Sequence, residues 1–202
     1  MSGYYKTGND VGVFGRLSFL IFIVVLGIES ARQTVARLKK GRRAEELEQF
    51  ALNDSMTGMY NRNAYDYFVK NEKDFEGYVI VTFDLNNLKQ CNDQYGHRAG
   101  DEYIINAAHI IEDNFERYGK CYRIGGDEFC CIISKGRYFK IERVMHKIDQ
   151  DVEILNHKNI IPVPVGIAYG YAVFTADDTD PEKVRERADE DMYRNKKTMK
   201  QF

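Results

Sequence analysis

RIGGDEFCCII, the stretch at residues 123–133, joins two short apolar segments through a pair of glycines. Residues 121–124 read CYRI and residues 129–133 read FCCII, which is the composition of buried strands. A Gly-Gly turn between two such segments predicts a β-hairpin. Because Gly125 and Gly126 carry no side chains, a ligand can approach the backbone closely at the tip, where the acids Asp127 and Glu128 follow.

The hydrophobic pattern on either side of this hairpin alternates between helix and strand. Residues 78–83 read YVIVTF, a β-branched and aromatic buried strand, and residues 163–174 form a second long strand region. Helices are expected at residues 61–73, 99–118, 138–155 and 181–199, the last opened by Pro181 after Asp180. This order predicts an α+β fold, with helices packed on one sheet.

A carboxylate, Asp84, stands at the end of the strand predicted at residues 78–83. Acids at a strand end and at a nearby hairpin tip can share Mg²⁺, which prefers oxygen ligands and binds phosphates. A glycine turn with solvated acids explains each element equally well when it is taken alone.

Four segments in the correct order resemble the GGDEF-domain family of bacterial diguanylate cyclases. The string RIGGDEF contains that family's name-giving motif, and FDLNNLKQCNDQYGHRAGD at residues 83–101 matches its upstream pattern. DSMTGMYNRNA at residues 54–64 resembles its opening segment, and ADEDMYRNKK at residues 188–197 resembles its closing helix.

The resemblance implies a ferredoxin-like, nucleotidyl-cyclase-type fold with a central antiparallel sheet flanked by helices. It implies condensation of two GTP molecules into cyclic di-GMP with release of pyrophosphate, as a homodimer, with Mg²⁺ or alternatively Mn²⁺ as cofactor. The second function that we consider is a catalytically silent GTP-binding regulatory module, since members of the family can lose turnover and keep the fold.

The resemblance also implies roles for individual positions. Metal ligands are implied at the carboxylates of Asp84 and Asp127 and at the backbone carbonyl of Leu85. Asp127 is implied to help deprotonate the attacking ribose 3′-hydroxyl, with support from Glu128, and Lys89 to stabilise the transition state.

Substrate contacts are implied at a second set of positions. Asn92 and Asp101 would hold guanine, because an amide and a carboxylate together match its O6 acceptor and its N1–H and N2–H donors. The remaining GTP-binding positions are His97, Gly125, Gly126, Lys196 and Lys200.

Several positions depart from the family pattern. Asn86 stands where many members have a second aspartate, and Lys200 replaces a closing-helix arginine, keeping the charge without its bidentate geometry. Glu116 and Gly119 occupy the positions of the arginine and aspartate that bind inhibitory product in many relatives. We therefore expect no product feedback through that site.

The N-terminal quarter has a different character. Residues 17–28 read LSFLIFIVVLGI, and we expect a transmembrane helix at residues 11–28, after a tail at residues 1–10. A signal peptide or a core helix would also be apolar, but the start is not basic and the run has no polar stripe. Six basic residues lie between positions 32 and 43, whereas only Lys6 and Arg16 precede the run. The positive-inside rule therefore predicts a single-pass protein of the inner or plasma membrane with its catalytic domain in the cytoplasm.

Residues 29–52 are expected to form a helical linker, either a parallel coiled coil or a solvated single helix, and residues 53–202 the GGDEF domain. The 29 basic and 31 acidic residues give a net charge of -2, which offers no basic face for a nucleic-acid partner. The four cysteines show no metal-ligand spacing and are expected to be reduced core thiols.

Overall fold

The computed structural model describes residues 7–134 and 141–199. The chain divides into two compact units, Met1–Gln49 and Phe50–Phe202. The second unit contains every candidate site residue named above.

The N-terminal helix α1 extends over Thr7–Leu52. Its segment Phe14–Val35, of 22 residues with a mean hydropathy of 1.8, is long and apolar enough to cross a membrane, and its apolar side chains are exposed. It is the one such helix among the described residues. The span expected at residues 11–28 and the linker expected at residues 29–52 thus lie on one continuous helix. This helix also includes residues 7–10 of the expected tail, whose first six residues lie outside the described residues.

Within the described residues, five strands form one mixed sheet in the order β1-β3-β4-β2-β5. Their bounds are Tyr60–Asn61 for β1, Val79–Asn86 for β2, Gly119–Arg123 for β3, Glu128–Ile133 for β4 and Gly166–Val173 for β5. The inner strand β2 pairs antiparallel with both β4 and β5, and only the short edge strand β1 runs parallel to its neighbour β3. The predicted antiparallel sheet is therefore confirmed, with a parallel edge added.

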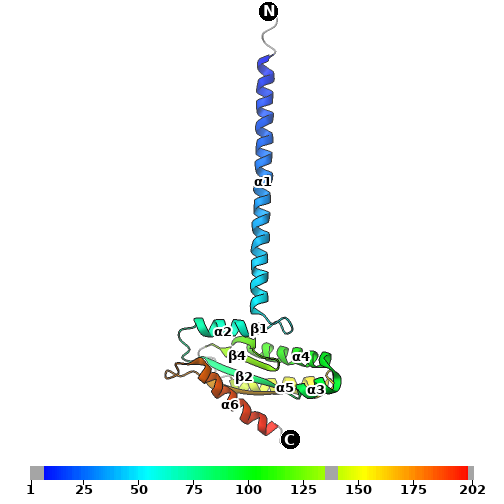
Figure 1. Ribbon diagram of the computed structural model, residues 1–202, viewed down its shortest axis with the longest axis vertical. Helices are drawn as coiled ribbons and strands as arrows, with labels where there is room; N and C mark the ends of the chain where they lie inside the picture. Colours follow the sequence, from blue (N-terminus) through cyan, green and yellow to red (C-terminus); the bar gives the residue numbers. More distant parts are fainter. Residues whose placement is uncertain (1–6, 135–140, 200–202) are drawn as a thin grey trace, which may run out of the picture. The chain divides into compact units, whose positions relative to one another are not determined.

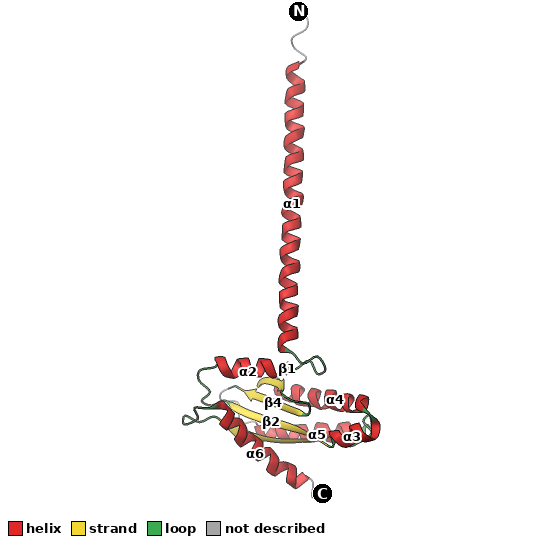
Figure 2. Cartoon of the chain, viewed as in Figure 1, coloured by secondary structure: helices red, strands yellow, loops and turns green. Residues whose placement is uncertain are grey.

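Helices cover both faces of this sheet (Figures 1 and 2). One core cluster joins the sheet to α3 (Leu88–Tyr95), α4 (His97–Phe115) and α5 (Ile141–His157). The other joins it to α2 (Arg62–Asn71) and α6 (Pro181–Met199). The neighbours Cys130 and Cys131 belong to different clusters, because alternate residues of a strand face opposite sides. All four cysteines are buried free thiols, as expected.

Two expectations for the segment around Asp84 were wrong. The strand expected to end at residue 83 continues to Asn86, so Asp84 lies inside β2 and not beyond its end. The helix expected at residues 99–118 is preceded by a separate helix, α3, which starts two residues after β2. The chain makes this corner at Asn87, whose φ of 63° lies in the left-handed region that asparagine tolerates better than most residues. The start of the helix expected at residues 138–155 lies outside the described residues.

Candidate functional site

The pairing of β2 with β4 brings the candidate acids together. Asp84 lies directly opposite Glu128 in the antiparallel register. One residue further along, the Leu85 N–H donates a hydrogen bond of 3.1 Å to the Asp127 carbonyl. Asp84, Leu85, Asp127 and Glu128 therefore form one cluster where β2 meets the hairpin, although they are separated by about forty residues of sequence.

The hairpin tip is closed around its glycines. The N–H groups of Ile124 and Gly125 both donate to the Glu128 carbonyl, at 3.0 and 3.2 Å. A Cβ placed on Gly125 would lie 2.8 Å from a carboxylate oxygen of Glu128, whereas one on Gly126 would meet no atom within 4 Å. Gly126 is thus the open, exposed position of the tip, where a ligand can reach the backbone.

Helix α6 brings a basic side chain to the same cluster. The Lys196 ammonium forms an ion pair with Oδ1 of Asp84, and the two side chains are 24% and 19% exposed. This approach depends on Gly170 in β5, where a Cβ would lie 2.1 Å from the Met192 backbone nitrogen. A glycine at that position is what lets the backbone of α6 lie directly against the sheet.

The candidate guanine-binding residues lie at the corner between α3 and α4. Asn92 is on α3, and Asp101 is one turn into α4, which begins at His97. The two helices are separated by Gly96, whose φ of 82° favours glycine. Lys89, on the first turn of α3, is exposed, as are His97 and Asp101, so these polar groups are available to a ligand from solvent.

Two residues that were not singled out from the sequence hold this corner in place. A Cβ on Gly100 would lie 2.0 Å from Oδ1 of Asn92, so the glycine leaves room for the amide. The Tyr103 hydroxyl donates to the Asn86 carbonyl at 2.5 Å and accepts from the Gly166 N–H at 2.7 Å, tying α4 to the ends of β2 and β5. Burial raises the pKa of Tyr103 to about 12, so the hydroxyl remains a donor at neutral pH.

A second anchor joins the domain's opening segment to the hairpin. The Arg123 guanidinium donates to Oδ1 of Asp54 at 3.0 Å and to the Gly126 carbonyl at 2.9 Å. Asp54 also accepts from the Thr57 backbone and hydroxyl. Burial raises the pKa of Asp54, but the hydrogen bonds from Thr57 and Arg123 outweigh it, and the net pKa is lowered. Arg123 and Asp54 both belong to sequence motifs described above, but the motifs alone do not indicate that the two residues contact each other.

We expect Arg123→Met to reduce the free energy of unfolding by about 2 kcal/mol near neutral pH. The change removes the charge-assisted hydrogen bonds by which Arg123 joins Asp54 to the hairpin tip at Gly126. Since the pKa of Asp54 is lowered by folding, its stabilising contribution is present above its unfolded pKa and is lost as pH falls through the folded value. The variant should therefore begin to lose stability at higher pH on the acid side. Urea unfolding at several pH values measures both effects. Unfolding curves that coincide with those of wild type would show that these hydrogen bonds do not stabilise the domain.

The donor set of the acidic cluster fits a hard divalent cation. Asp84 and Asp127 would offer carboxylates and Leu85 a backbone carbonyl, all oxygen donors, and the ammonium of Lys196 lies beside Asp84. Among residues 7–134 and 141–199, no group of three or more His, Cys, Asp or Glu side chains is close enough to hold a metal. A cation here would therefore complete its shell with water and substrate phosphate, as Mg²⁺ commonly does.

The remaining candidate, Lys200, lies outside the described residues, so its relation to the cluster stays a prediction.

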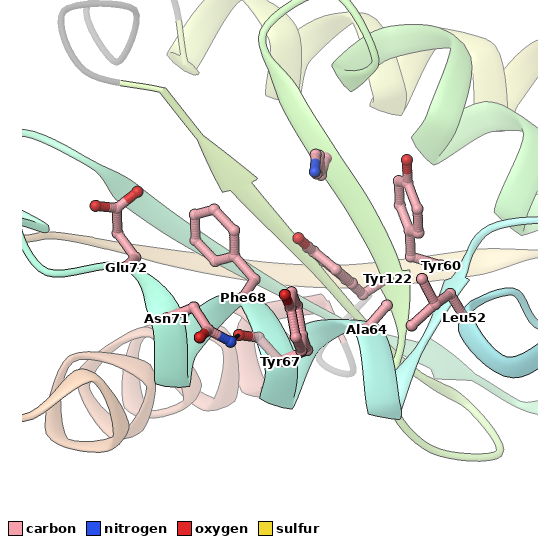
Figure 3. Close-up of a pocket in the computed structure, with 9 residues that line it drawn as sticks. Leu52, Tyr60, Ala64, Tyr67, Phe68, Asn71, Glu72 and Tyr122 are labelled. Carbon is pink, nitrogen blue, oxygen red and sulfur yellow. Dashed lines mark hydrogen bonds between the residues drawn. The ribbon is translucent and has the colours of Figure 1, made fainter. Parts of the chain in front are cut away.

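A separate cavity of about 350 Å³ lies between α2 and the outer strands (Figure 3). Its lining residues are Leu52, Tyr60, Ala64, Tyr67, Phe68, Asn71, Glu72, Lys120 and Tyr122. The lining is mainly aromatic and apolar, and it contains none of the candidate site residues. The candidate site residues lie instead on the acidic cluster and at the α3–α4 corner.

Comparison with curated proteins gives relatives of limited identity. The chain is 28% identical over 158 residues to the diguanylate cyclase DgcS of Shewanella oneidensis, covering 75% of this chain and 52% of that protein. It is 27% identical over 220 residues to the bifunctional diguanylate cyclase/cyclic di-GMP phosphodiesterase MucR of Pseudomonas aeruginosa, covering 95% of this chain and 32% of that protein. It is also 31% identical over 156 residues to the cyclic di-GMP phosphodiesterase PdeR of Escherichia coli, covering 75% and 24%. The chain thus spans between a quarter and about a half of these relatives.

Among solved structures, the coiled coil and GGDEF domain of DgcB from Caulobacter crescentus, in complex with c-di-GMP, superimposes with a TM-score of 0.74 at 22% identity. The superposition covers 86% of this chain and 95% of that one, so the two share a fold. The family model described as "Diguanylate cyclase, GGDEF domain" matches residues 51–201, which is most of the chain. This protein therefore belongs to the GGDEF-domain, or diguanylate cyclase, family.

Proposed function

We propose that the protein is an active diguanylate cyclase, which condenses two GTP molecules into cyclic di-GMP and releases two pyrophosphates. The observation that carries the proposal is the acidic cluster, in which Asp84 faces Glu128 and Leu85 is hydrogen-bonded to Asp127 beside the open glycine tip. If Asp127 and Glu128 were only solvated acids of a glycine turn, nothing would require them to lie beside Asp84 of β2.

The proposed reaction is a phosphoryl transfer performed twice. The 3′-oxygen of one GTP forms a bond to the α-phosphorus of the other, and the bond from that phosphorus to the bridging oxygen breaks, so that pyrophosphate leaves. Asp127, supported by Glu128, accepts the proton of the attacking hydroxyl. Repetition with the second 3′-hydroxyl closes the ring.

Several groups of the chain would prepare this step. Asp84, Asp127 and the Leu85 carbonyl would hold Mg²⁺, or Mn²⁺ in its place, which when bound neutralises triphosphate charge and lowers the pKa of the attacking hydroxyl. The Lys196 ammonium forms an ion pair with Asp84 and would contact the phosphates. Lys89 at the start of α3 and His97 at the start of α4 are both exposed, and they would contact the nucleotide.

We expect Asn92→Ala and Asp101→Ala to raise the KM for GTP about ten- to a hundredfold, because each leaves a guanine donor or acceptor unmatched. Gly100→Ala should act in the same direction, since its Cβ would displace the Asn92 amide. The matched control is Asn106→Ala, whose side chain bonds the Glu102 carbonyl on its own helix. Competition between GTP and ATP measures the preference for guanine over adenine. If Asn92→Ala and Asp101→Ala discriminate between GTP and ATP as wild type does, the guanine pocket lies elsewhere.

The proposed enzyme acts as a homodimer. One domain supplies one acidic cluster and one guanine-binding corner, and the product contains two guanosines, so two domains must face each other across a two-fold axis. The apolar segment Phe14–Val35 supports tethering to the inner membrane, with the basic residues that follow it on the cytoplasmic side.

The test of this proposal is incubation of the purified full chain with GTP and Mg²⁺ over a range of protein concentrations. We expect cyclic di-GMP by chromatography, with a rate per protomer that rises with concentration until the dimer is saturated. GTP binding without any cyclic di-GMP would favour the silent regulatory module.

Product feedback through the family's usual position is not expected. Glu116 is exposed and would repel phosphate, and a Cβ on Gly119 would lie 1.9 Å from the Ile132 carbonyl oxygen, so the strand itself excludes a side chain there. Progress curves with added cyclic di-GMP should therefore show only weak competition with GTP. Strong non-competitive inhibition at low micromolar product would contradict this prediction.

A further inference from the structure

The ion pair between Lys196 and Asp84 joins two residues that the proposed reaction uses for different partners. Asp84 is the candidate ligand for a divalent cation, and Lys196 is the candidate contact for the triphosphate. In the structure, the ammonium donates to Oδ1 of Asp84. Both side chains are about three quarters or more covered, so their attraction is screened less by solvent than that of a surface pair.

The backbone that carries Lys196 is held firmly. The Tyr171 N–H donates to the Asp191 carboxylate at 3.2 Å, and the Asn195 amide donates to the Tyr169 carbonyl at 3.1 Å. Gly170 lets α6 lie against β5 between these two bonds. A change of partner by Lys196 therefore requires only rotation of its flexible four-carbon side chain, with no movement of the helix.

A divalent cation and an ammonium compete on this carboxylate. An Mg²⁺ ion lies about 2.1 Å from a ligand oxygen, which puts it within a few ångströms of any ammonium on the same carboxyl group. Like charges at that separation repel, most strongly where solvent is partly excluded. The repulsion is relieved only when Lys196 finds another anionic acceptor, and the triphosphate of a nucleotide is such an acceptor.

We propose that Lys196 occupies Asp84 as a substitute cation in the ligand-free enzyme and moves to the nucleotide phosphates when the metal binds. The inference rests on the proposed function and adds a coupling to it. The free enzyme binds divalent ions weakly, and nucleotide and metal bind cooperatively because each removes the obstacle to the other. A purely structural ion pair would hold Lys196 on Asp84 in every state.

The test measures Mn²⁺ binding to the nucleotide-free full chain in detergent, by the electron paramagnetic resonance signal of free Mn²⁺. Lys196→Gln should bind Mn²⁺ about five- to tenfold more tightly than wild type, because the competing charge is gone. Lys196→Arg should bind as weakly as wild type, since the charge is retained. The control is Lys197→Gln, the adjacent residue, whose ammonium lies 4.2 Å from the centre of the Tyr193 ring.

Equal Mn²⁺ affinity in wild type and Lys196→Gln, with both folded by thermal unfolding, overturns the exchange and leaves the metal assignment in place. Asp84→Asn separates the two claims, because it should lose Mn²⁺ binding in every background. If Asp84→Asn retains wild-type Mn²⁺ affinity, the metal assignment of the proposed function fails together with the exchange. If Lys196→Gln does not fold, Lys196→Arg is the deciding variant. Tighter Mn²⁺ binding by Lys196→Arg than by wild type would contradict a competition based on charge.

Discussion

Replacing Asp84 or Asp127 with asparagine is expected to reduce cyclic di-GMP synthesis by about 10³-fold or more. Each change removes a charged metal oxygen, and a loss of about 4 kcal/mol in transition-state stabilisation corresponds to that factor. The neutral amide keeps the shape of the side chain and, at position 84, can still accept from Lys196. The effect should therefore appear in kcat with little change in folding.

Initial rates of product formation, measured beside thermal unfolding of each variant, check this prediction. Asp113→Asn is the matched control, because Asp113 is an exposed acid on α4. Turnover near that of wild type in either site variant at ordinary Mg²⁺ would contradict the metal assignment.

Gly170→Val is expected to have the largest effect on the fold, lowering the free energy of unfolding by about 3 kcal/mol or more. A Cβ at this position would lie 2.1 Å from the Met192 nitrogen and 2.4 Å from the Ala188 carbonyl oxygen. These are backbone atoms of α6 and cannot rotate away, so the helix must leave the sheet. Since α6 carries Lys196 to Asp84, activity should fall together with stability.

Gly126→Ala is the control for this substitution. A Cβ there meets no atom within 4 Å, and Gly126 is not among the glycines with positive φ. Its stability should stay within about 0.5 kcal/mol of wild type. Urea unfolding compares the two variants, and a Gly170→Val curve that coincides with wild type would show that α6 does not depend on this close approach.

The elements that could be predicted from the sequence are those with local signals. The Gly-Gly turn marks the hairpin of β3 and β4, and Pro181 after Asp180 marks the start of α6 at the residue observed. The helix α3 was missed, because no helix was expected between residues 84 and 98 and its sequence LKQCNDQY is mainly polar. The extension of β2 to Asn86 was missed because Asp84 was taken as the polar residue that ends the strand.

The site could be predicted only as far as residue types and motif order allow. The contacts that assemble it are long-range, such as Arg123 with Asp54 across 69 residues and Lys196 with Asp84 across 112. Nothing in the spacing of those residues indicates that they meet, because the contacts depend on how the sheet is ordered and how α6 folds back on it. The close backbone approaches at Gly100 and Gly170 could not be predicted from the sequence either, because a glycine in a helix or strand has many explanations.

The most direct test follows the fate of GTP by phosphorus NMR, with the full chain and Mg²⁺. We expect loss of the three GTP resonances and growth of a phosphodiester resonance and of pyrophosphate, with two pyrophosphates for each cyclic di-GMP. Asp127→Asn, under the same conditions, should leave the GTP resonances unchanged. Binding of GTP by wild type without any phosphodiester, or release of inorganic phosphate in place of pyrophosphate, would contradict the claim that this chain is a diguanylate cyclase.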